Sequence, residues 1–256
     1  MEDDFILIKG NGPILITAPH NIKTYRYCNS PSHANDTNNH KPGEFRVLEH
    51  ARENHIEQIL NRLYKKLGKK NCTIMTWNKD KVKWVVPMDP NHTSNNMSNS
   101  LWFKHLKKLK KRLSKCVLHI DLHGMRNIST ENHIELGIKA FKKTNLKLYK
   151  KIKPKIKKEF DKLGVKYTLY GKFTGSGYDK PHSTVTDKGN VLGFKSIQIE
   201  IQTNVRKKLV TNNKFLNKFA SILKNIYKEL KPICNIKTKK VKRKKKSRRN
   251  KTRRKR

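Results

Sequence analysis

The chain has 256 residues, enough for one large α/β domain with a sizeable core, and its hydrophobic fraction of 34% excludes a wholly disordered protein. No apolar run approaches the ~20 residues that span a bilayer, so no membrane partner is expected. The formal net charge is +42, and 15 of the last 20 residues are Lys or Arg, which predicts a salt-dependent attraction to phosphate-rich polymers but is not itself a function.

Short β-branched runs alternate with longer amphipathic segments along the chain. The runs predict strands at residues 5–8, 13–18, 72–77, 83–87, 116–121, 165–170 and 195–201. The amphipathic segments predict helices at residues 43–67, 101–113, 141–163 (with a break before Pro154) and 212–230. This alternation predicts an α/β fold whose mostly parallel central sheet is flanked by helices. We expect one domain over residues 1–232 and a disordered basic tail over residues 233–256.

Polar side chains stand at three predicted strand ends where a pure core would carry apolar ones. His20 directly follows the run TAP. In HIDLHG, alternation along the strand places His119, Asp121 and His123 on one face. Glu200 stands inside IQIEI, where a charge is costly unless it is paired or bound to a metal. Because parallel sheets bind ligands beyond the carboxyl ends of their strands, these residues are the candidates for a site.

The residue types at these positions match a hydrolytic zinc centre. In such centres two imidazoles and one carboxylate bind Zn²⁺ and leave one position open for water, whose pKa falls to about 7. A separate carboxylate accepts the proton of that water. In this interpretation His20 and His123 supply the imidazoles and Glu200 supplies the base, while Asp121 orients a ligand histidine.

An ordered series of short motifs carries a resemblance to a known family. TAPHN is followed by an acid that opens a predicted helix (GEFRVLEHA), then by IDLHG, by ELG at residues 135–137, and by IQIEI with Arg206 beyond it. This series covers residues 13–206 and resembles the N-formylglutamate amidohydrolase family, which shares its fold with zinc carboxypeptidases and aspartoacylases. The resemblance implies a zinc-exopeptidase-like fold.

The resemblance also implies roles for four residues: zinc ligation by His20, His123 and Glu44, and general-base catalysis by Glu200. The third ligand stays open between Glu44 and the nearby His40 and Asp36. Lys23 stands where carboxypeptidases place a ligand glutamate, three residues after the first histidine. The choice of substrate is therefore less determined than the choice of metal.

Each of these residues also has a simpler interpretation. The two histidines could be loop or core histidines bonded to a neighbour, and Glu44 could be an acid that stabilises a helix N-terminus. Glu200 could form a buried ion pair with one of the many lysines. Arg126 and Arg206 could each bind a substrate carboxylate through two parallel hydrogen bonds, or could simply face solvent.

The sequence thus predicts a zinc-dependent hydrolase that cleaves an amide in an N-acyl amino acid or a peptide-like substrate. The alternative is a catalytically inactive hydrolase fold that acts as a basic nucleic-acid-associated protein, because the net charge is +42. The tail is expected to bind nucleic acid or another polyanion, or to serve as a nuclear localisation signal.

The four cysteines include no CxxC pair, and the acidic N-terminus does not resemble a signal peptide. We therefore expect free thiols in a soluble, intracellular protein. Its expected location is the nucleus or nucleolus in a eukaryotic cell and the cytoplasm otherwise.

Deleting residues 237–256 should lower the affinity for RNA or DNA steeply at physiological salt, because the deletion removes 15 cationic side chains. The zinc content should stay unchanged, since no candidate ligand lies in the deleted segment. Filter binding over a salt series and elemental analysis measure the two effects. An unaltered affinity would show that the tail only keeps the protein in solution.

Overall fold

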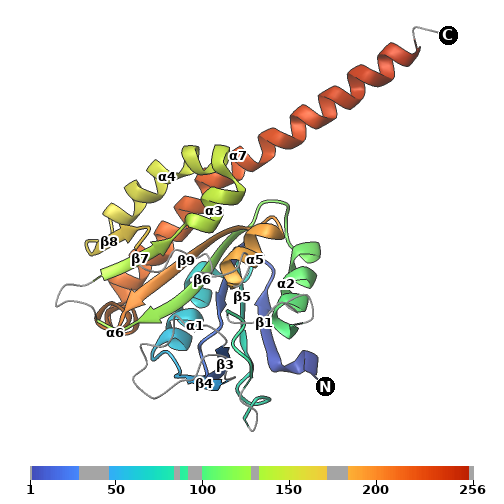
Figure 1. The fold of residues 1–256 in the computed structure, drawn as a ribbon. Helices are drawn as coiled ribbons and strands as arrows, with labels where there is room; N and C mark the ends of the chain where they lie inside the picture. Colours follow the sequence, from blue (N-terminus) through green and yellow to red (C-terminus); the bar gives the residue numbers. More distant parts are fainter. Residues whose placement is uncertain are drawn as a thin grey trace.

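A seven-stranded mixed sheet forms the centre of the protein in the computed structural model, which describes residues 2–28, 46–83, 87–91, 100–127, 133–171 and 184–253 (Figure 1). The strand order is β1-β5-β2-β6-β9-β7-β8, and β3 pairs with β4 in a separate two-stranded sheet. The strands are β1 (Ile6–Gly10), β2 (Ile14–Ala18), β3 (Thr24–Cys28), β4 (Arg46–His50), β5 (Cys72–Trp77), β6 (Leu118–Met125), β7 (His133–Gly137), β8 (Lys166–Leu169) and β9 (Lys195–Gln202). The helices are a short 3₁₀ helix (Glu2–Phe5), α1 (Ile56–Leu67), α2 (Leu101–Arg112), α3 (Lys139–Thr144), α4 (Leu146–Asp161), α5 (Val185–Val191), α6 (Thr203–Thr211) and α7 (Asn213–Arg253).

Four neighbouring strands at the centre of the sheet, β5, β2, β6 and β9, run parallel to one another. β1 lies antiparallel at one edge, and the parallel pair β7 and β8 lies antiparallel to β9 at the other. The predicted α/β fold, with a mostly parallel sheet flanked by helices, is therefore confirmed. The carboxyl ends of the four parallel strands share one edge, which is where such sheets bind ligands.

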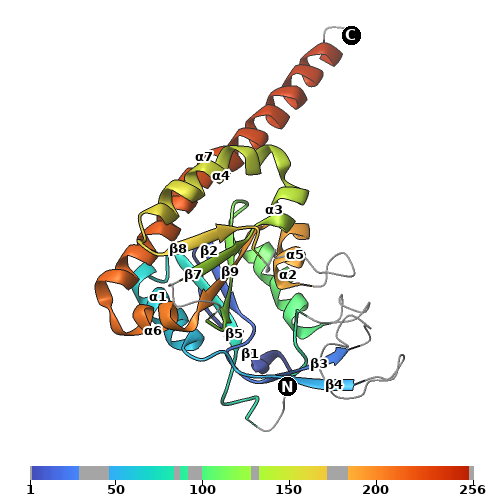
Figure 2. The ribbon, with the colours of Figure 1, turned by 60° about the vertical axis from the view of Figure 1, so that its left-hand side comes forward.

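The two faces of the sheet differ because side chains alternate along each strand. On one face, Ile16, Ile120 and Ile199 pack into a large apolar core with residues of α1, α4, α6 and α7. On the other face, α2 and α5 contribute to a smaller apolar cluster that includes Leu15 and Trp102. Figure 2 shows the two groups of helices on different sides of the strands. The rest of this second face, over β6 and β9, carries polar side chains.

The helix predicted over residues 43–67 is wrong in its first half. Residues 46–50 form β4, which pairs antiparallel with β3, and α1 begins only at Ile56. His55, just before α1, has a φ of 69°, a left-handed conformation that a continuous right-handed helix cannot contain. The pairing with β3 supplies backbone hydrogen bonds from residues about 20 positions away, which the helical spacing of apolar residues does not reveal.

The helix predicted over residues 141–163 is divided, but not before Pro154. The division falls at Asn145, between α3 and α4, and Pro154 lies inside α4. Pro154 is exposed, so water can reach the carbonyl group that loses its amide partner at this position.

The remaining predicted elements are confirmed to within a few residues, with two exceptions. The helix predicted at 212–230 begins at Asn213 but ends only at Arg253, and residues 84–86 of the strand predicted at 83–87 lie outside the described residues. The sequence did not predict β3, β4, β7, α5 or α6, which are short. Periodicity is weak over so few residues.

The basic segment after residue 232, which the sequence predicts to be a disordered tail, continues α7 as a helix as far as Arg253. Figure 1 shows this end of α7 projecting away from the packed body. The division into a domain and a separate tail between residues 232 and 233 stays a prediction.

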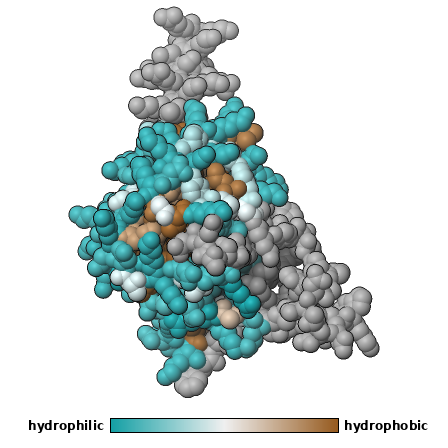
Figure 3. All heavy atoms as spheres, turned by 90° about the vertical axis from the view of Figure 1, so that its left-hand side faces the viewer, coloured by the Kyte–Doolittle hydropathy of each residue, from teal (hydrophilic) through white to brown (hydrophobic). Residues whose placement is uncertain are grey.

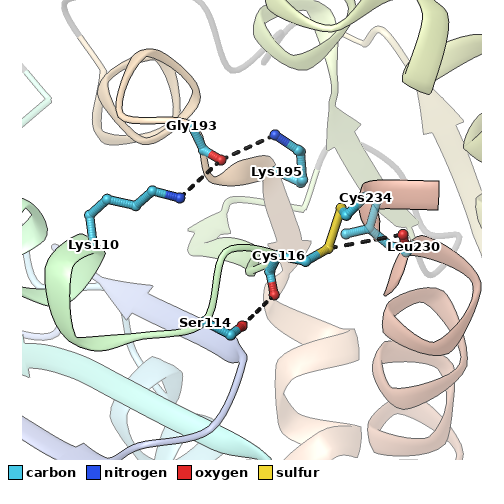
Figure 4. Close-up of a disulfide and its surroundings, with 7 residues drawn as sticks. All are labelled: Lys110, Ser114, Cys116, Gly193, Lys195, Leu230 and Cys234. Carbon is cyan, nitrogen blue, oxygen red and sulfur yellow. Dashed lines mark hydrogen bonds between the residues drawn. A yellow bond between two sulfur atoms is a disulfide. The ribbon is translucent and has the colours of Figure 1, made fainter. Parts of the chain in front are cut away.

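A disulfide joins Cys116, just before β6, to Cys234 in α7 (Figure 4). The prediction of free thiols is therefore wrong for these two cysteines, whereas Cys72 is free and buried, with a pKa that burial raises to about 12. The bonded cysteines are 118 residues apart in sequence, and only the packing of α7 against the sheet brings their Cα atoms to 5.8 Å. The cysteine pattern consequently gives no ground for a reducing compartment.

Hydrophilic residues cover most of the face seen in Figure 3, with small apolar areas between them. The large hydrophobic side chains exposed among the described residues are Leu146, Tyr170 and Val191. Within the same residues, no helix combines the length and the apolar character needed to cross a membrane.

Replacing Cys234 by Ala should lower the free energy of unfolding by about 2–4 kcal/mol under oxidising conditions. The reason is that the cross-link joins residues 118 positions apart and so restricts the unfolded chain. Urea unfolding measures the change. In the presence of a reductant the variant and the wild type should unfold together, and a difference that persists there would contradict the disulfide as its cause.

Candidate metal centre

Three strand ends and one connecting segment bring the candidate residues together. His20 lies two residues beyond the end of β2, and His123 and Glu200 are register partners on the adjacent strands β6 and β9. Glu53 comes from the segment between β4 and α1. None of the four side chains is more than 8% exposed, so their charges act in a region of low dielectric constant.

Three atoms that could ligate a metal ion lie close together at this point. His20 Nδ1 lies 2.9 Å from Glu53 Oε1 and 3.1 Å from His123 Nδ1. His123 Nδ1 lies 3.6 Å from the same Glu53 oxygen. Ligands about 2.0–2.1 Å from a tetrahedral Zn²⁺ stand roughly 3.3 Å apart, so the triangle has the size that a zinc ion requires.

The other ring nitrogen of each histidine lies beside a carboxylate. His20 Nε2 is 3.0 Å from Asp89 Oδ1, and His123 Nε2 is 3.3 Å from Asp121 Oδ2. A carboxylate can only accept a hydrogen bond, so Nε2 carries a proton in both rings. Nδ1 of each ring then faces the other candidate ligand atoms. Metal-ligating histidines are held by carboxylates in this way. The three candidate ligand atoms therefore fit Zn²⁺, and the role of Asp121 in orienting a ligand histidine stays a prediction.

Burial lowers the pKa of His20, but the negative charges of Asp89 and Glu53 outweigh burial and raise that pKa to about 9. His123 behaves alike: burial opposes protonation, yet Asp121 and Glu53 hold its pKa well above the usual value. Conversely, the charge of His20 outweighs burial and lowers the pKa of Glu53. Without a metal, this cluster therefore holds protons in the place of a cation.

Glu200 differs from the other acids of the cluster. Burial raises its pKa to about 7, helped by the charge of Glu53 and opposed by that of His123. One oxygen, Oε1, accepts a hydrogen bond of 2.6 Å from Gln198 Nε2. A carboxyl group with a pKa near neutrality can both accept and return a proton at physiological pH, which is what general-base chemistry requires.

The predicted carboxylate ligand, Glu44, and its rivals Asp36 and His40 lie outside the described residues, so their role stays a prediction. The described structure instead places Glu53 between the two histidines. The sequence does not point to Glu53, because the spacing of its apolar residues predicts one long helix whose polar residues face solvent. The pair His50 and Glu53, three residues apart, was the available signal.

Glu53 has contacts beyond His20 and His123. Its second oxygen accepts a hydrogen bond of 2.7 Å from the backbone N–H of Gly124. His50 Nε2 lies 3.6 Å from Oε1, and the ring of His50 packs edge-on 4.1 Å from that of His20. His20, His50 and Glu53 therefore form a second set of possible ligands, which shares two members with the first.

Arg206 and Arg126 occupy different surroundings. The buried guanidinium of Arg206 donates to the carbonyl oxygens of Met125 and Ile201 and to Thr203 Oγ1. It also fills the space beside Gly124, where a Cβ atom would lie 2.0 Å from Arg206 Nη1. Arg206 thereby supports the backbone that holds Glu53, whereas Arg126 is exposed just past β6. Binding of a substrate carboxylate by either arginine stays a prediction.

The described fold is similar to several solved structures. One is a zinc-free form of YndL (17% identity, TM-score 0.44), matched over 87% of this chain and 88% of that one. A second is a metallo-carboxypeptidase from Pseudomonas aeruginosa (13%, TM-score 0.46), matched over 86% of this chain and 61% of that one. A third is the succinylglutamate desuccinylase from Chromobacterium violaceum (11%, TM-score 0.43), matched over 88% and 67%.

No family model matches the sequence, and no curated protein matches it. The identities and TM-scores of the three structures limit the likeness to the fold. None of the three is described as an N-formylglutamate amidohydrolase, so that assignment stays a prediction.

Zinc binding at pH 7 should release at least one proton per ion, because the raised pKa values of His20 and His123 favour protonated rings in the metal-free protein. The apparent affinity should then fall as the pH falls below neutrality, because protons compete with the ion for the histidines. Calorimetric titration in buffers of different ionisation enthalpy counts the protons. His105→Gln, which alters a buried histidine of α2, should leave the count unchanged. Release of fewer than one proton would contradict the ligand assignment.

The raised pKa of His20 also affects the stability of the metal-free protein. A raised pKa means that protonated His20 stabilises the metal-free fold below pH 6.5, and that this contribution disappears as the pH rises through about 9. Thermal unfolding of the metal-free protein should therefore occur at lower temperature at pH 9 than at pH 6.5.

Proposed function

We propose that this protein is a zinc-dependent hydrolase that cleaves an amide bond, with Glu200 as its general base. The observation that supports the proposal most is the convergence of His20 Nδ1, Glu53 Oε1 and His123 Nδ1. Beside them stands the carboxyl group of Glu200, whose pKa is raised. Each ligand histidine has a carboxylate at its other nitrogen, as a metal centre requires.

His20, Glu53 and His123 would hold the ion. Three protein ligands leave one position open, which distinguishes a catalytic zinc site from a structural one. When bound, Zn²⁺ supplies a Lewis acid that makes water more acidic and polarises the scissile carbonyl group. Arg206, Gly124 and Asp89 support the ligands without binding the ion.

Glu200 moves the proton in this proposal. Its carboxylate accepts a proton from the attacking water as the water oxygen bonds to the carbonyl carbon. Glu200 then returns that proton to the amide nitrogen as the carbon–nitrogen bond breaks, so the products are a carboxylic acid and an amine. Gln198 holds Oε1, which leaves Oε2 to face the water. A pKa of about 7 suits a group that must accept and donate within one cycle.

The substrate that we propose is an N-acyl amino acid or a peptide-like amide. The motif series and its resemblance to N-formylglutamate amidohydrolases support this choice. The polyanion-binding role of the basic tail is a separate proposal that does not depend on the metal centre, since it rests on the 15 cationic residues among the last 20.

Replacing Glu200 by Gln should leave zinc content and folding near those of the wild type, while kcat falls by on the order of 10²–10⁴. The amide keeps the volume of the side chain but cannot accept the proton. The effect is measured by hydrolysis of a panel of N-formyl and N-acetyl amino acids and short peptides, with the released amine as the readout.

Glu159→Gln is the matched control, because Glu159 is a buried glutamate of α4 outside the site and its loss should leave kcat unchanged. Loss of zinc from the Glu200 variant would make Glu200 a ligand, and full activity would remove it from catalysis. A wild type that hydrolyses no member of the panel would overturn the proposed substrate class.

A further inference from the structure

A chain of buried polar side chains lies beneath the metal centre, on the polar face of the sheet. It runs from Ser196 on β9 to His119 on β6, then to Thr17 on β2, and back to Asp121 on β6, so it crosses three adjacent strands. All four side chains are fully buried. Its far end reaches His123 through the contact of 3.3 Å between Asp121 and the Nε2 of that histidine.

Asp121 sets the direction of the hydrogen bonds. Each of its two carboxylate oxygens lies at hydrogen-bond distance from a threonine hydroxyl, and a carboxylate oxygen accepts. Thr17 Oγ1 must therefore donate to Oδ1 over 2.7 Å, and Thr186 Oγ1 to Oδ2 over 2.9 Å. His123 Nε2 must also donate. Two groups lie near that nitrogen: Asn91 Nδ2 at 3.4 Å and the carboxylate of Asp121 at 3.3 Å. The amide NH₂ of Asn91 is a donor, so the carboxylate is the acceptor.

The donor and acceptor roles at Asp121 also fix those between Thr17 and His119. The hydroxyl of Thr17 has one proton, and that proton is directed at Asp121. The contact of 2.9 Å between Thr17 Oγ1 and His119 Nε2 must then be donated by the histidine. Burial lowers the pKa of His119 to about 4 despite the charge of Asp121, so its ring is neutral and Nδ1 is an acceptor.

The last bond closes the chain. Ser196 Oγ lies 2.8 Å from His119 Nδ1 and must donate to it. Gly189 of α5 seals this end, since a Cβ atom there would lie 2.3 Å from Ser196 Oγ and 2.5 Å from His119 Nδ1. Phe194 packs its ring edge-on 5.9 Å from that of His119. No competing donor or acceptor for His119 is seen among the described side chains, so one proton arrangement satisfies the whole chain.

We propose that Thr17, His119 and Ser196 are positioning residues that fix the orientation of Asp121 and, through it, keep the Nδ1 atom of His123 directed at the metal. The proposal rests on the proposed metal centre and adds three residues that do not touch the ion. The carboxylate of Asp121 accepts hydrogen bonds from Thr17, Thr186 and His123, so it cannot rotate away from His123. Thr17 is the link on which the chain depends, because its hydroxyl both accepts from His119 and donates to Asp121.

The proton arrangement can be observed without any metal. In ¹⁵N-labelled wild type, His119 should be a neutral imidazole with its proton on Nε2 throughout pH 5.5–8. This result is expected because Nδ1 faces a serine hydroxyl and Nε2 faces a threonine oxygen that has no proton left to offer. A proton on Nδ1, or a charged ring in this range, would overturn the chain.

The consequence for the metal is tested at Thr17 with two variants. Thr17→Val keeps the shape and loses the hydroxyl, whereas Thr17→Ser keeps the hydroxyl. The dissociation constant for Zn²⁺, measured by competition with a chelator, should rise about 10- to 100-fold in the Val variant and stay within about threefold of the wild type in the Ser variant. Equal losses in both variants, or no loss in Val, would overturn the positioning role.

Thr73→Val is the matched control. Thr73 is also fully buried in the sheet and donates to a backbone carbonyl, that of Gly12, but lies outside the chain. Its zinc affinity should equal that of the wild type, and a loss as large as in Thr17→Val would show a general effect of altering the sheet. If the wild type binds no zinc, the proposed function fails, while the protonation of His119 still decides whether the chain exists.

Discussion

The need to compensate buried carboxylates governs the arrangement of this site. Glu53, Asp89, Asp121 and Glu200 gather within one region, and an isolated buried charge there would be very costly. Cationic groups surround them. His20 and His123 carry raised pKa values, Arg206 lies near Glu53 and Glu200, and the ammonium of Lys188 reaches the Asp89 and Asp121 region from α5. A divalent cation between His20, Glu53 and His123 would take the place of histidine protons in this balance.

Lys188 shows how far this compensation extends from the ligands. It is only 3% exposed, donates to the carbonyl of Pro90 over 2.7 Å, and has a pKa that burial lowers to about 7 against the charges of Asp89, Asp121 and Asp187. The segment Asp89–Asn91 thus joins several parts of the site: Asp89 holds His20, Pro90 accepts from Lys188, and Asn91 accepts from the first amide of α5. Helix α5 is thereby tied to the histidines, although it contributes no ligand.

The sheet makes the polar layer possible. Alternation along β6 and β9 directs Ile120 and Ile199 into the large apolar core and directs Asp121 and Glu200 to the opposite face. The apolar face packs against several helices and stabilises the sheet, so the polar face can hold charged groups in rigid positions. Because neighbouring strands are in register, His123 and Glu200 stand side by side without any loop to position them.

The sequence by itself determined the strands that carry the candidate site and four of the residues that gather there. Runs such as ILITA, LHIDLHG and SIQIEI are local patterns, and a strand shows its two faces through alternation within a few residues, so His20, Asp121, His123 and Glu200 could be recognised. Tertiary structure alone decided the third donor, the disulfide and the chain under His123. Glu53, Cys234 and Thr17 reach their partners across 71, 118 and 104 residues of sequence, and such contacts depend on strand order and helix packing rather than on local periodicity.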